Sequence, residues 1–165
     1  MRRFERFSLS DMQNSIFSIA SNELYLVTDY NKLQYPNYCR WFYGTNIPRV
    51  LSGKGEIIFY VDGCSKIAGL VILKKDVELK ICTFMVRPEY RRMGLGSKLA
   101  EDSFEKLGTG FPGITIPETR IDEFEPLITK YGWVESRVID DYYSPEIVFN
   151  DPKDIIIEPQ KRLKK

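Results

Sequence analysis

A short stretch near the middle of the chain combines glycines and cations in a pattern that suits an anionic ligand. Residues 86–96 read VRPEYRRMGLG, in which a single residue separates Gly94 from Gly96, and Arg91 and Arg92 come shortly before them. The stretch follows a predicted strand and opens a predicted helix, whose N-terminus presents unpaired N–H groups and a partial positive charge. Glycines let a phosphate approach the backbone closely. These features predict a diphosphate-binding site.

The spacing of the glycines excludes two well-known phosphate motifs. A Walker A loop requires GxxxxGK[ST] and a dinucleotide fingerprint requires GxGxxG, whereas the residue three positions after Gly96 is Leu99. A bare GxG is weak evidence, since cations at a helix start are most often solvated surface residues. The ligand must therefore be inferred from the stretch together with the elements around it.

Three closely spaced extended segments precede the stretch. Glu56–Val61 is rich in β-branched and aromatic residues, and Asp62-Gly63 after it is a strong hairpin signal because glycine tolerates positive φ. Lys66–Lys75 and Glu78–Val86 are the next two predicted strands. Such short connections predict an antiparallel meander that leads directly into the glycine stretch.

The segments after the stretch alternate between helix and strand. Apolar residues at helical spacing predict a helix over about Leu95–Leu107, followed by a short buried strand at Gly113–Ile116. A second helix is expected over about Asp122–Tyr131, where Gly132 ends it. Two final strands, Trp133–Asp140 and Glu146–Phe149, form a predicted β pair.

The first third of the chain is harder to interpret. Asp11 suits the N-cap of a short helix through Ile19, and Glu23–Asp29 (ELYLVTD) has the composition of a strand. Residues 36–51 read as helical, with a break or kink expected at Pro48. The order of elements predicts an α/β (α+β) domain over residues 1–150, with a mixed, mostly antiparallel sheet flanked by helices, and a loose basic tail at 151–165.

The glycine stretch and its surroundings resemble the acetyl-CoA signature of the GNAT acetyltransferase superfamily. The family's loop, Q/R-x-x-G-x-G/A, is matched by Arg91, Gly94 and Gly96, and its V-x-P-x-[YF]-R is matched by Val86, Pro88, Tyr90 and Arg91. The helix end KYGW at Lys130–Trp133 is similar to the family's KxGF. The resemblance covers roughly residues 40–150 and implies the GNAT fold.

The resemblance also implies how acetyl-CoA, as the co-substrate, would be held. Backbone groups of Phe84, Met85 and Val86 would pair with the pantetheine arm as an added strand does. The pyrophosphate would bind the amides of the loop together with a serine hydroxyl, that is Arg91, Arg92, Met93, Gly94, Leu95, Gly96 and Ser97. Splayed strands at Glu78–Val86 and Gly113–Ile116 would admit the thioester.

Two positions depart from the family pattern. Many members have an asparagine after the second of these strands and a tyrosine four residues before the glycine of KxGF. Aligned on Gly132, these positions are Ile121 and Ile128. The usual proton donor to the thiolate is therefore absent, so that either another residue serves or the thiolate leaves unassisted, as a thiol pKa of about 8.5 permits.

The catalytic candidates are carboxylates and a tyrosine. A primary ammonium must lose a proton before it attacks, and Glu78, at the start of a predicted strand, is the first candidate for the base. Glu118 is the second, and Tyr131 is the candidate proton donor. Cys82 could face the pantetheine, and the aromatic cluster Trp41–Tyr43 could line an acceptor pocket. Each of these residues also has an ordinary explanation in surface or core packing.

The composition narrows the chemistry. The chain has 165 residues with 24 Lys plus Arg and 23 Asp plus Glu, and its net charge of +1 argues against nucleic acid or an anionic membrane as a partner. It has no histidine, which excludes Ser-His and Cys-His nucleophiles. The three separate cysteines indicate neither a disulfide framework nor zinc, and no metal is expected. Because the N-terminus does not resemble a signal peptide, the expected location is the cytoplasm.

The sequence thus predicts an acetyl-CoA-dependent N-acetyltransferase that acetylates a primary amine of a small molecule, peptide or protein by direct attack. A toxin-like acetyltransferase of aminoacyl-tRNA is an alternative, which the basic KRLKK end would suit. A non-catalytic acyl-CoA-binding module is another, which the isoleucines at the two family positions would suit. The sequence does not identify the amine acceptor, and a homodimer remains open.

Overall fold

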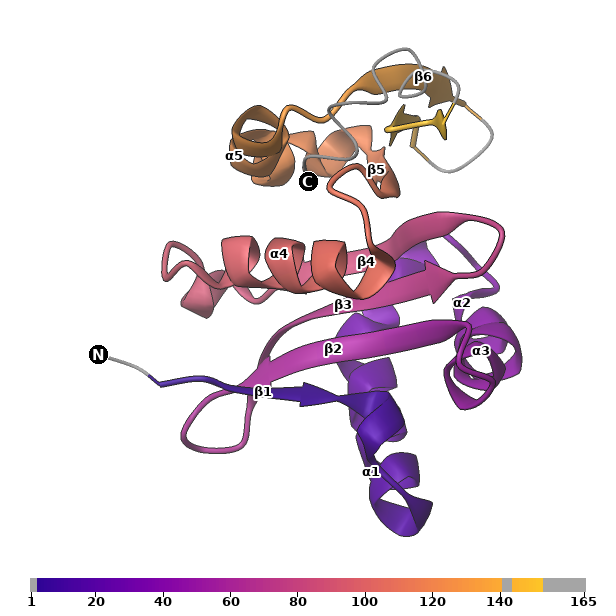
Figure 1. Ribbon diagram of the computed structural model, residues 1–165, viewed down its shortest axis with the longest axis vertical. Helices are drawn as coiled ribbons and strands as arrows, with labels where there is room; N and C mark the ends of the chain where they lie inside the picture. The colour runs from indigo at the N-terminus through magenta and orange to yellow at the C-terminus, as the bar shows by residue number, and fades with distance from the viewer. Residues whose placement is uncertain (1–2, 141–143, 153–165) are drawn as a thin grey trace.

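The computed structural model describes residues 3–140 and 144–152, which fold around a seven-stranded sheet (Figure 1). The strand order is β1-β2-β3-β4-β5-β7-β6, and neighbours are antiparallel except β4 and β5, which are parallel. The strands are β1 (Glu5–Ser8), β2 (Gly55–Val61), β3 (Ile67–Lys75), β4 (Leu79–Val86), β5 (Gly113–Pro117), β6 (Glu135–Ile139) and β7 (Glu146–Phe149). The predicted mixed, mostly antiparallel sheet is confirmed.

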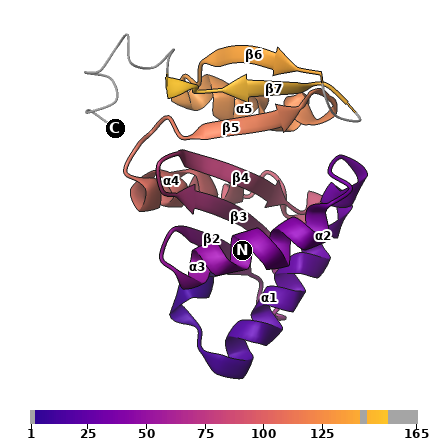
Figure 2. The same ribbon diagram turned by 90° about the vertical axis from the view of Figure 1, so that its right-hand side faces the viewer.

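Helices cover both faces of the sheet, and each face has its own apolar cluster. On one face lie α1 (Asn14–Thr28), α2 (Tyr38–Trp41) and α3 (Ile47–Leu51) (Figure 2). Leu24 of α1, Val50 of α3 and Phe42 between α2 and α3 are buried in one apolar cluster with residues of β2 and β3. On the other face lie α4 (Leu95–Leu107) and α5 (Ile121–Tyr131), packed on the second cluster. A ligand between β4 and β5 would therefore lie between two separate cores.

The β2-β3-β4 meander is the rigid centre of the fold. β2 and β3 are buried along most of their length, as expected for β-branched and aromatic strands covered on both faces. The turn between them is held by Asp62, whose carboxylate accepts hydrogen bonds from the backbone N–H of Cys64 and Lys66, both at 2.9 Å. This confirms the predicted meander and its hairpin turn.

Close packing against a glycine fixes the position of α4. A Cβ on Gly69 in β3 would lie 2.9 Å from the carbonyl oxygen of Met85 and 3.1 and 3.3 Å from the side chains of Leu99 and Leu95. The helix can approach the sheet this closely because Gly69 has no side chain. Gly94 and Gly108 flank the helix with φ of 79° and 74°, left-handed values that favour glycine.

The first third of the chain differs from the prediction. Glu23–Asp29 is not a strand, because α1 runs to Thr28, and α1 starts at Asn14 while Asp11 lies in a preceding 3-10 turn. The buried residues of α1 are Ser21, Leu24 and Thr28, at helical spacing. Two of these are polar, and their hydroxyls bond carbonyls one turn earlier in the helix, so a search for apolar residues misses the period. β1 was also not predicted.

The predicted break near Pro48 takes a specific form. Between α2 and α3, residues Phe42–Asn46 form a π-helical segment, so the helix continues with a wider turn. A proline lacks the N–H that an α-helix needs four residues after Gly44, and a π-bulge is one way in which a helix accommodates that loss. The predicted helical stretch over 36–51 is otherwise confirmed.

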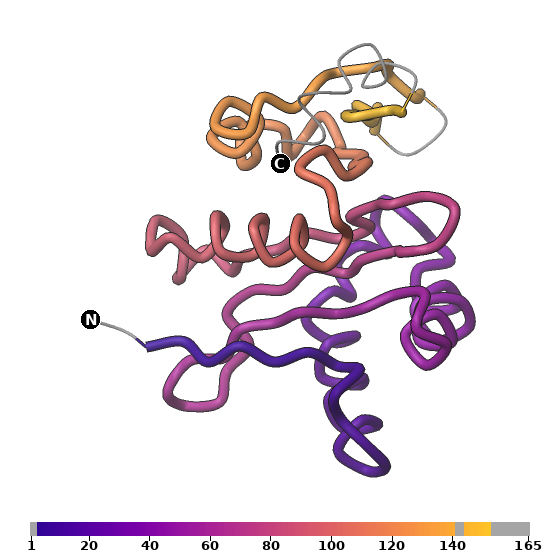
Figure 3. The backbone as a smooth tube through the Cα atoms, in the orientation of Figure 1, coloured from indigo at the N-terminus to yellow at the C-terminus, as the bar shows by residue number. Residues whose placement is uncertain are grey.

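The backbone falls into two groups of elements joined by one crossing (Figure 3). The chain passes from α4 through residues 108–112 to β5, which lies with β6, β7 and α5 and adjoins the β1–β4 group through a short pairing with β4. The predicted tail at 151–165 lies outside the described residues except for positions 151 and 152. None of the helices within the described part of the chain is long and apolar enough to cross a membrane.

Candidate functional site

The two parallel strands run together briefly and then separate. Their pairing consists of Lys80 with Gly113 and Ile81 with Ile114. Beyond these pairs β5 follows β7 to its end, whereas β4 follows β3 as far as Val86. The edge of β4 that faces the separation therefore lies outside the β4–β5 ladder. This confirms the predicted splay of the two strands.

The glycine loop places a helix start beside this separation. Arg92 and Gly94 both have positive φ, 64° and 79°, so the backbone turns sharply before α4. Gly94 is the N-cap and offers no side chain to the first amides, while the first helical bond runs from Lys98 N to Gly94 O at 3.2 Å. A Cβ on Gly96 would meet nothing among the described residues within 4 Å. Packing does not require this glycine, so its space is available to a ligand.

A groove lies between the loop, β4 and α5, and we call it the loop groove. It has a volume of about 460 Å³ and is lined by Phe84, Val86, Gly94, Gly96, Ser97 and Leu127 among others. The sequence-predicted binding residues thus gather here, with three exceptions, one of which is Met85, whose buried side chain belongs to the apolar cluster of the α1 face. The side chain of Leu95 is buried in the core, and Met93 is 44% exposed, so these two can contribute mainly their amides.

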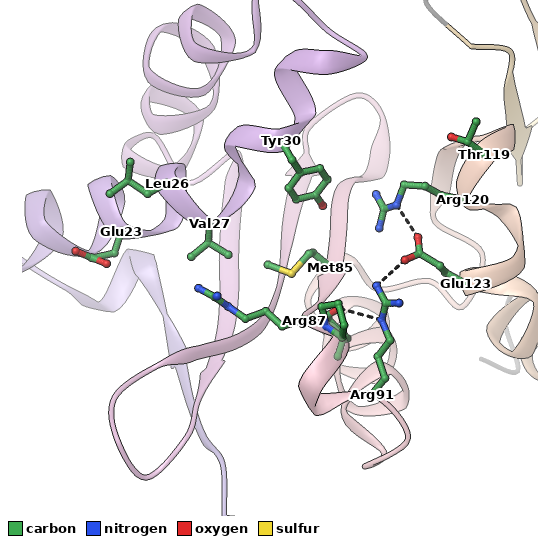
Figure 4. Close-up of a pocket in the computed structure, with 12 residues that line it drawn as sticks. Glu23, Leu26, Val27, Tyr30, Met85, Arg87, Arg91, Thr119, Arg120 and Glu123 are labelled. Carbon is green, nitrogen blue, oxygen red and sulfur yellow. Dashed lines mark hydrogen bonds and ion pairs between the residues drawn. The ribbon is translucent and has the colours of Figure 1, made fainter.

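Two arginines and a glutamate bridge the separation at its open end (Figure 4). Glu123 of α5 forms ion pairs with Arg91 at 2.5 Å and with Arg120 at 2.7 Å. The same arginines donate to carbonyls of β4, Arg91 to Val86 and Arg120 to Phe84, both at 3.3 Å. The resemblance assigns the carbonyls of Phe84 and Val86 to pairing with pantetheine. In this structure they accept hydrogen bonds from Arg91 of the glycine loop and from Arg120, which lies just before α5.

The bridge borders an open cavity of about 740 Å³, here called the edge cavity. Figure 4 shows Leu26, Val27 and Tyr30 on one side of it and Arg120 and Glu123 on the other. It shares four residues with the loop groove, namely Val86, Arg91, Arg120 and Glu123. The edge cavity thus extends the groove toward the face of the sheet that α1 covers.

A third hollow, the helix-side cavity, lies on the α1–α2 face and has a volume of about 380 Å³. The N-terminal segment contributes Tyr35, Tyr38 and Trp41 to its lining. The strands beside the separation contribute Thr83 from β4 and Thr115 from β5. This cavity and the loop groove therefore approach the same separation from opposite faces.

Glu146, at the start of β7, is the buried carboxylate of the helix-side cavity. It is 2% exposed and pairs in register with Pro117, the last residue of β5. Its carboxylate accepts a hydrogen bond from the hydroxyl of Tyr35. Burial raises the pKa of Glu146 to about 6, against the opposite effect of a hydrogen bond with Gln34. A carboxyl group with this pKa can accept a proton near neutral pH.

Sequence reasoning did not find Glu146. The sequence predicts the strand that Glu146 begins, but nothing local in the sequence marks this residue as catalytic. The available signal was a glutamate that begins a short, buried, otherwise apolar strand, EIVF. Carboxylates are seldom fully buried without a partner, so a glutamate in an apolar strand indicates either a specific partner or a functional role.

The two carboxylates chosen from the sequence lie in more open positions. Glu78 lines the helix-side cavity but precedes β4, and its side chain is 51% exposed and paired with Lys74 at 3.0 Å. Glu78 is therefore a half-exposed, ion-paired carboxylate. Glu118 is exposed in the turn after β5, and its backbone N–H donates to Pro145 at 2.8 Å. The catalytic role of either residue remains a prediction.

Tyr131 packs between the two helices of the opposite face. Its ring lies 4.9 Å from that of Phe104 in α4, and its hydroxyl donates to Glu101 at 2.7 Å. Burial and the Glu101 hydrogen bond raise the pKa of Tyr131 to about 12. Its role as proton donor remains a prediction. Ile121 and Ile128, at the family's asparagine and tyrosine positions, pack on the apolar cluster.

The remaining candidates divide between the cavity and the core. Cys82 lines the helix-side cavity, and burial raises the pKa of its thiol. Of the aromatic cluster, Trp41 lines the same cavity, Phe42 is fully buried, and Tyr43 bonds Asn22 near the surface at 2.8 Å. One of the three predicted aromatic residues therefore borders the site.

The splayed parallel pair beside a glycine-rich helix start has the arrangement of the GNAT fold. The sequence model of the acetyltransferase (GNAT) family matches residues 14–113. The chain therefore belongs to the GNAT acetyltransferase family. No curated protein matches the sequence.

Solved structures of acetyltransferases share the fold at low sequence identity. An acetyltransferase from Bacillus subtilis in complex with CoA is 18% identical, with a TM-score of 0.54 over 90% of this chain and 97% of that one. A GNAT acetyltransferase from Staphylococcus aureus Mu50 is 12% identical, with a TM-score of 0.59 over 90% and 100%. Nourseothricin acetyltransferase is 15% identical, with a TM-score of 0.52 over 59% and 64%, so the match spans less than two thirds of that protein.

Proposed function

We propose that the protein is an N-acetyltransferase that passes the acetyl group of acetyl-CoA to a primary amine by direct attack. The observation that carries the proposal is the β4–β5 separation, which the loop groove approaches from one face and the helix-side cavity from the other. The pantetheine arm of acetyl-CoA would enter the separation from the loop groove and place the thioester there. The amine would approach the thioester from the helix-side cavity. The two substrates could then be bound at the same time.

The residues of the loop groove fit a diphosphate and its attached arm. The amides of residues 91–97 at the start of α4 suit the diphosphate, since a helix N-terminus favours an anion. The β4 edge at Phe84–Val86 suits the amide groups of pantetheine, once Arg91 and Arg120 release its carbonyls. An acetyltransferase from Bacillus subtilis with the same fold was crystallised in complex with CoA, which supports CoA as the ligand.

Direct transfer requires one proton to be removed and one bond to be exchanged. The amine nitrogen attacks the carbonyl carbon of the thioester, a C–N bond forms, and the C–S bond breaks. The attacking ammonium first gives a proton to a base, and CoA leaves as a thiolate, whose pKa of about 8.5 makes it a tolerable leaving group. Glu78 as base and Tyr131 as acid remain predictions, as do a homodimer and a cytoplasmic location.

The test is thiol release from acetyl-CoA with a panel of amines, combined with thermal unfolding in the presence of CoA. We expect CoA to raise the melting temperature, because a ligand bound to the native state stabilises it. Release with a free amine supports the proposal. Release with aminoacyl-tRNA in place of free amines would favour the tRNA alternative, and CoA binding without release would favour a non-catalytic module. Absence of a shift at millimolar CoA would reject the cofactor.

A further inference from the structure

We propose that Glu146 is the catalytic base and that the acceptor is a small amine which also carries an anionic group. The inference rests on the proposed function and names the acceptor class of the same site. Its starting point is the helix-side cavity, which combines one buried carboxylate with several cations around about 380 Å³. That volume suits a small molecule.

The position of Glu146 brings a carboxylate to the end of the separation. It lies beside Pro117, where β5 has already left β4, and on the face that the N-terminal segment covers. Two contacts with that segment fix it there. Tyr35 donates to its carboxylate, and the side chain of Gln34 bonds Ser144, two residues earlier, both by accepting from Ser144 Oγ and by donating to its carbonyl, each at 2.9 Å.

The surroundings of Glu146 supply few charges of their own. The phenol of Tyr35 contacts Glu146, and Tyr38 of α2 lines the same cavity with its hydroxyl donating to Thr28. Burial raises the pKa of Tyr38 to about 12. From β5 and β6 its neighbours are Pro117 and Ile139. The charged groups that share the cavity, described below, belong to α3, β3, β4 and the turn between β3 and β4. Glu146 therefore keeps a raised pKa chiefly because it is buried.

The cations of the cavity outnumber its anions. Lys74 pairs with Glu78 at 3.0 Å, so the other charged groups that line the cavity are the cations Arg49 and Lys80 and the carboxylate of Glu146. Neither Arg49 nor Lys80 has an ion-pair partner among the described residues. An acceptor with a carboxylate or phosphate would complement these two cations, whereas a diamine would meet repulsion. The cavity thus favours an amine at Glu146 and an anion at Arg49 and Lys80.

The proton step is balanced without a further reactant. The substrate ammonium gives one proton to the Glu146 carboxylate, and the free amine then attacks the thioester carbonyl. A C–N bond forms, the C–S bond breaks, and the electron pair leaves on the sulfur of CoA. The proton on Glu146 returns to solvent or to the thiolate before the next turnover. Tyr35, which contacts Glu146, is a positioning residue.

The acceptor class is tested with matched amines of similar size. Thiol release is measured with β-alanine, 2-aminoethyl phosphate, β-alaninamide and 1,3-diaminopropane, each corrected for its fraction of free amine. We expect kcat/KM for the better of the two anionic amines to exceed that for β-alaninamide by about tenfold to a hundredfold, the value of a charged hydrogen bond. Lys80→Met should remove this preference through KM. Equal or better use of the neutral or dicationic amine would overturn the acceptor class and leave the transferase function standing.

The base is tested with three carboxylate variants. Glu146→Gln should lower kcat by about 10²–10⁴-fold while the CoA-dependent rise in melting temperature stays. We expect kcat of the wild type to fall below an apparent pKa of about 6, and Glu146→Gln should remove this dependence. Glu135→Gln, an exposed carboxylate on β6, is the control and should change neither. A fall in kcat with Glu78→Gln but not with Glu146→Gln would move the base to Glu78 and reject this proposal.

A milder variant keeps the inference testable if Glu146→Gln folds poorly. Tyr35→Phe removes the hydroxyl that stabilises the ionised carboxylate, so the acid limb of kcat should move to higher pH. A merely structural role of Tyr35 would lower activity without moving the limb, which would count against Glu146. If the wild type releases no thiol with any amine although CoA binds, both the proposed function and this inference fail.

Discussion

The two faces of the sheet offer different kinds of contact to a ligand at the β4–β5 separation. On the α4–α5 face the loop groove presents backbone amides at a helix start, beside Gly94 and Gly96. On the α1–α2 face the cavity presents side chains, with Tyr35 and Glu146 in contact across 111 positions of sequence. In the proposed enzyme, one continuous segment at the start of α4 would bind the cofactor. The acceptor would be bound by residues that are distant in sequence and meet only in the folded chain. Variants that affect one face and spare the other test this difference.

The largest effect is expected at Gly96. A tyrosine there would fill the space that the loop groove keeps open, so Gly96→Tyr should weaken CoA binding by at least about a hundredfold, or about 2.7 kcal/mol. Isothermal titration with CoA measures the loss. Gly44→Tyr is the matched control, because a Cβ at Gly44 also meets nothing within 4 Å among the described residues. Unchanged CoA affinity in Gly96→Tyr would mean that the diphosphate binds elsewhere.

The next largest effect is expected at Gly69, where β3 packs against α4 and so fixes the position of the helix start. Gly69→Ala would push a methyl group against the Met85 carbonyl and against Leu95 and Leu99 of α4. Overpacking of this kind costs about 1–3 kcal/mol, and the displaced helix should also bind CoA more weakly. Chemical denaturation measures the stability and titration the affinity. Normal stability would show that α4 is free to shift without cost.

A smaller effect is expected from the bridge at Glu123. Glu123→Gln removes a negative charge beside the groove and frees Arg91 and Arg120 from their shared partner. CoA affinity should rise several-fold, while stability should fall by no more than about 1 kcal/mol, as is usual for exposed ion pairs. Glu125→Gln, exposed on the same helix, is the control. Weaker CoA binding in Glu123→Gln would show that the bridge organises the site instead of covering it.

The smallest effect is a dependence of stability on pH. The pKa of Glu146 is raised from 4.5 to about 6, so between these values the native state binds more protons than the unfolded state. The stability that this carboxyl contributes is therefore present below about pH 4.5 and is lost as the pH rises through about 6. Wild type and Glu146→Gln should have similar melting temperatures at pH 4, and the variant the higher one at pH 7. The opposite order at pH 7 would indicate a lowered pKa.

The glycine loop and the elements around it could be predicted from the sequence because their signals are local. Gly94, Gly96 and Arg91 lie within six residues, and backbone recognition needs glycines at fixed spacing. The β2-β3-β4 meander could also be predicted from the sequence, since strands rich in β-branched residues and an Asp-Gly turn are short-range features. The apolar pattern of α4 and the glycine that ends α5 likewise gave both helices to within a residue.

The residues around the proposed acceptor cavity could not be predicted because they come together only in the folded chain. Glu146 has an unusual environment owing to Tyr35 and to β5, neither of which is near it in sequence. The exposed position of Glu78 depends on where β4 begins, a boundary that composition does not fix. In α1, buried Ser21 and Thr28 concealed the helical period.

The β4–β5 junction has a consequence for how the protein opens. Two register pairs are the backbone link of this parallel ladder, and side-chain contacts such as Tyr35 with Glu146 span the remainder. Backbone amides of β5 should then exchange with deuterium sooner than those of β3, because cooperative units joined by few hydrogen bonds open more readily. A substrate that fills the separation adds contacts to both sides and should slow exchange in β5 more than in β3. With substrate bound, the two groups of elements on either side of the separation would then unfold as a single cooperative unit.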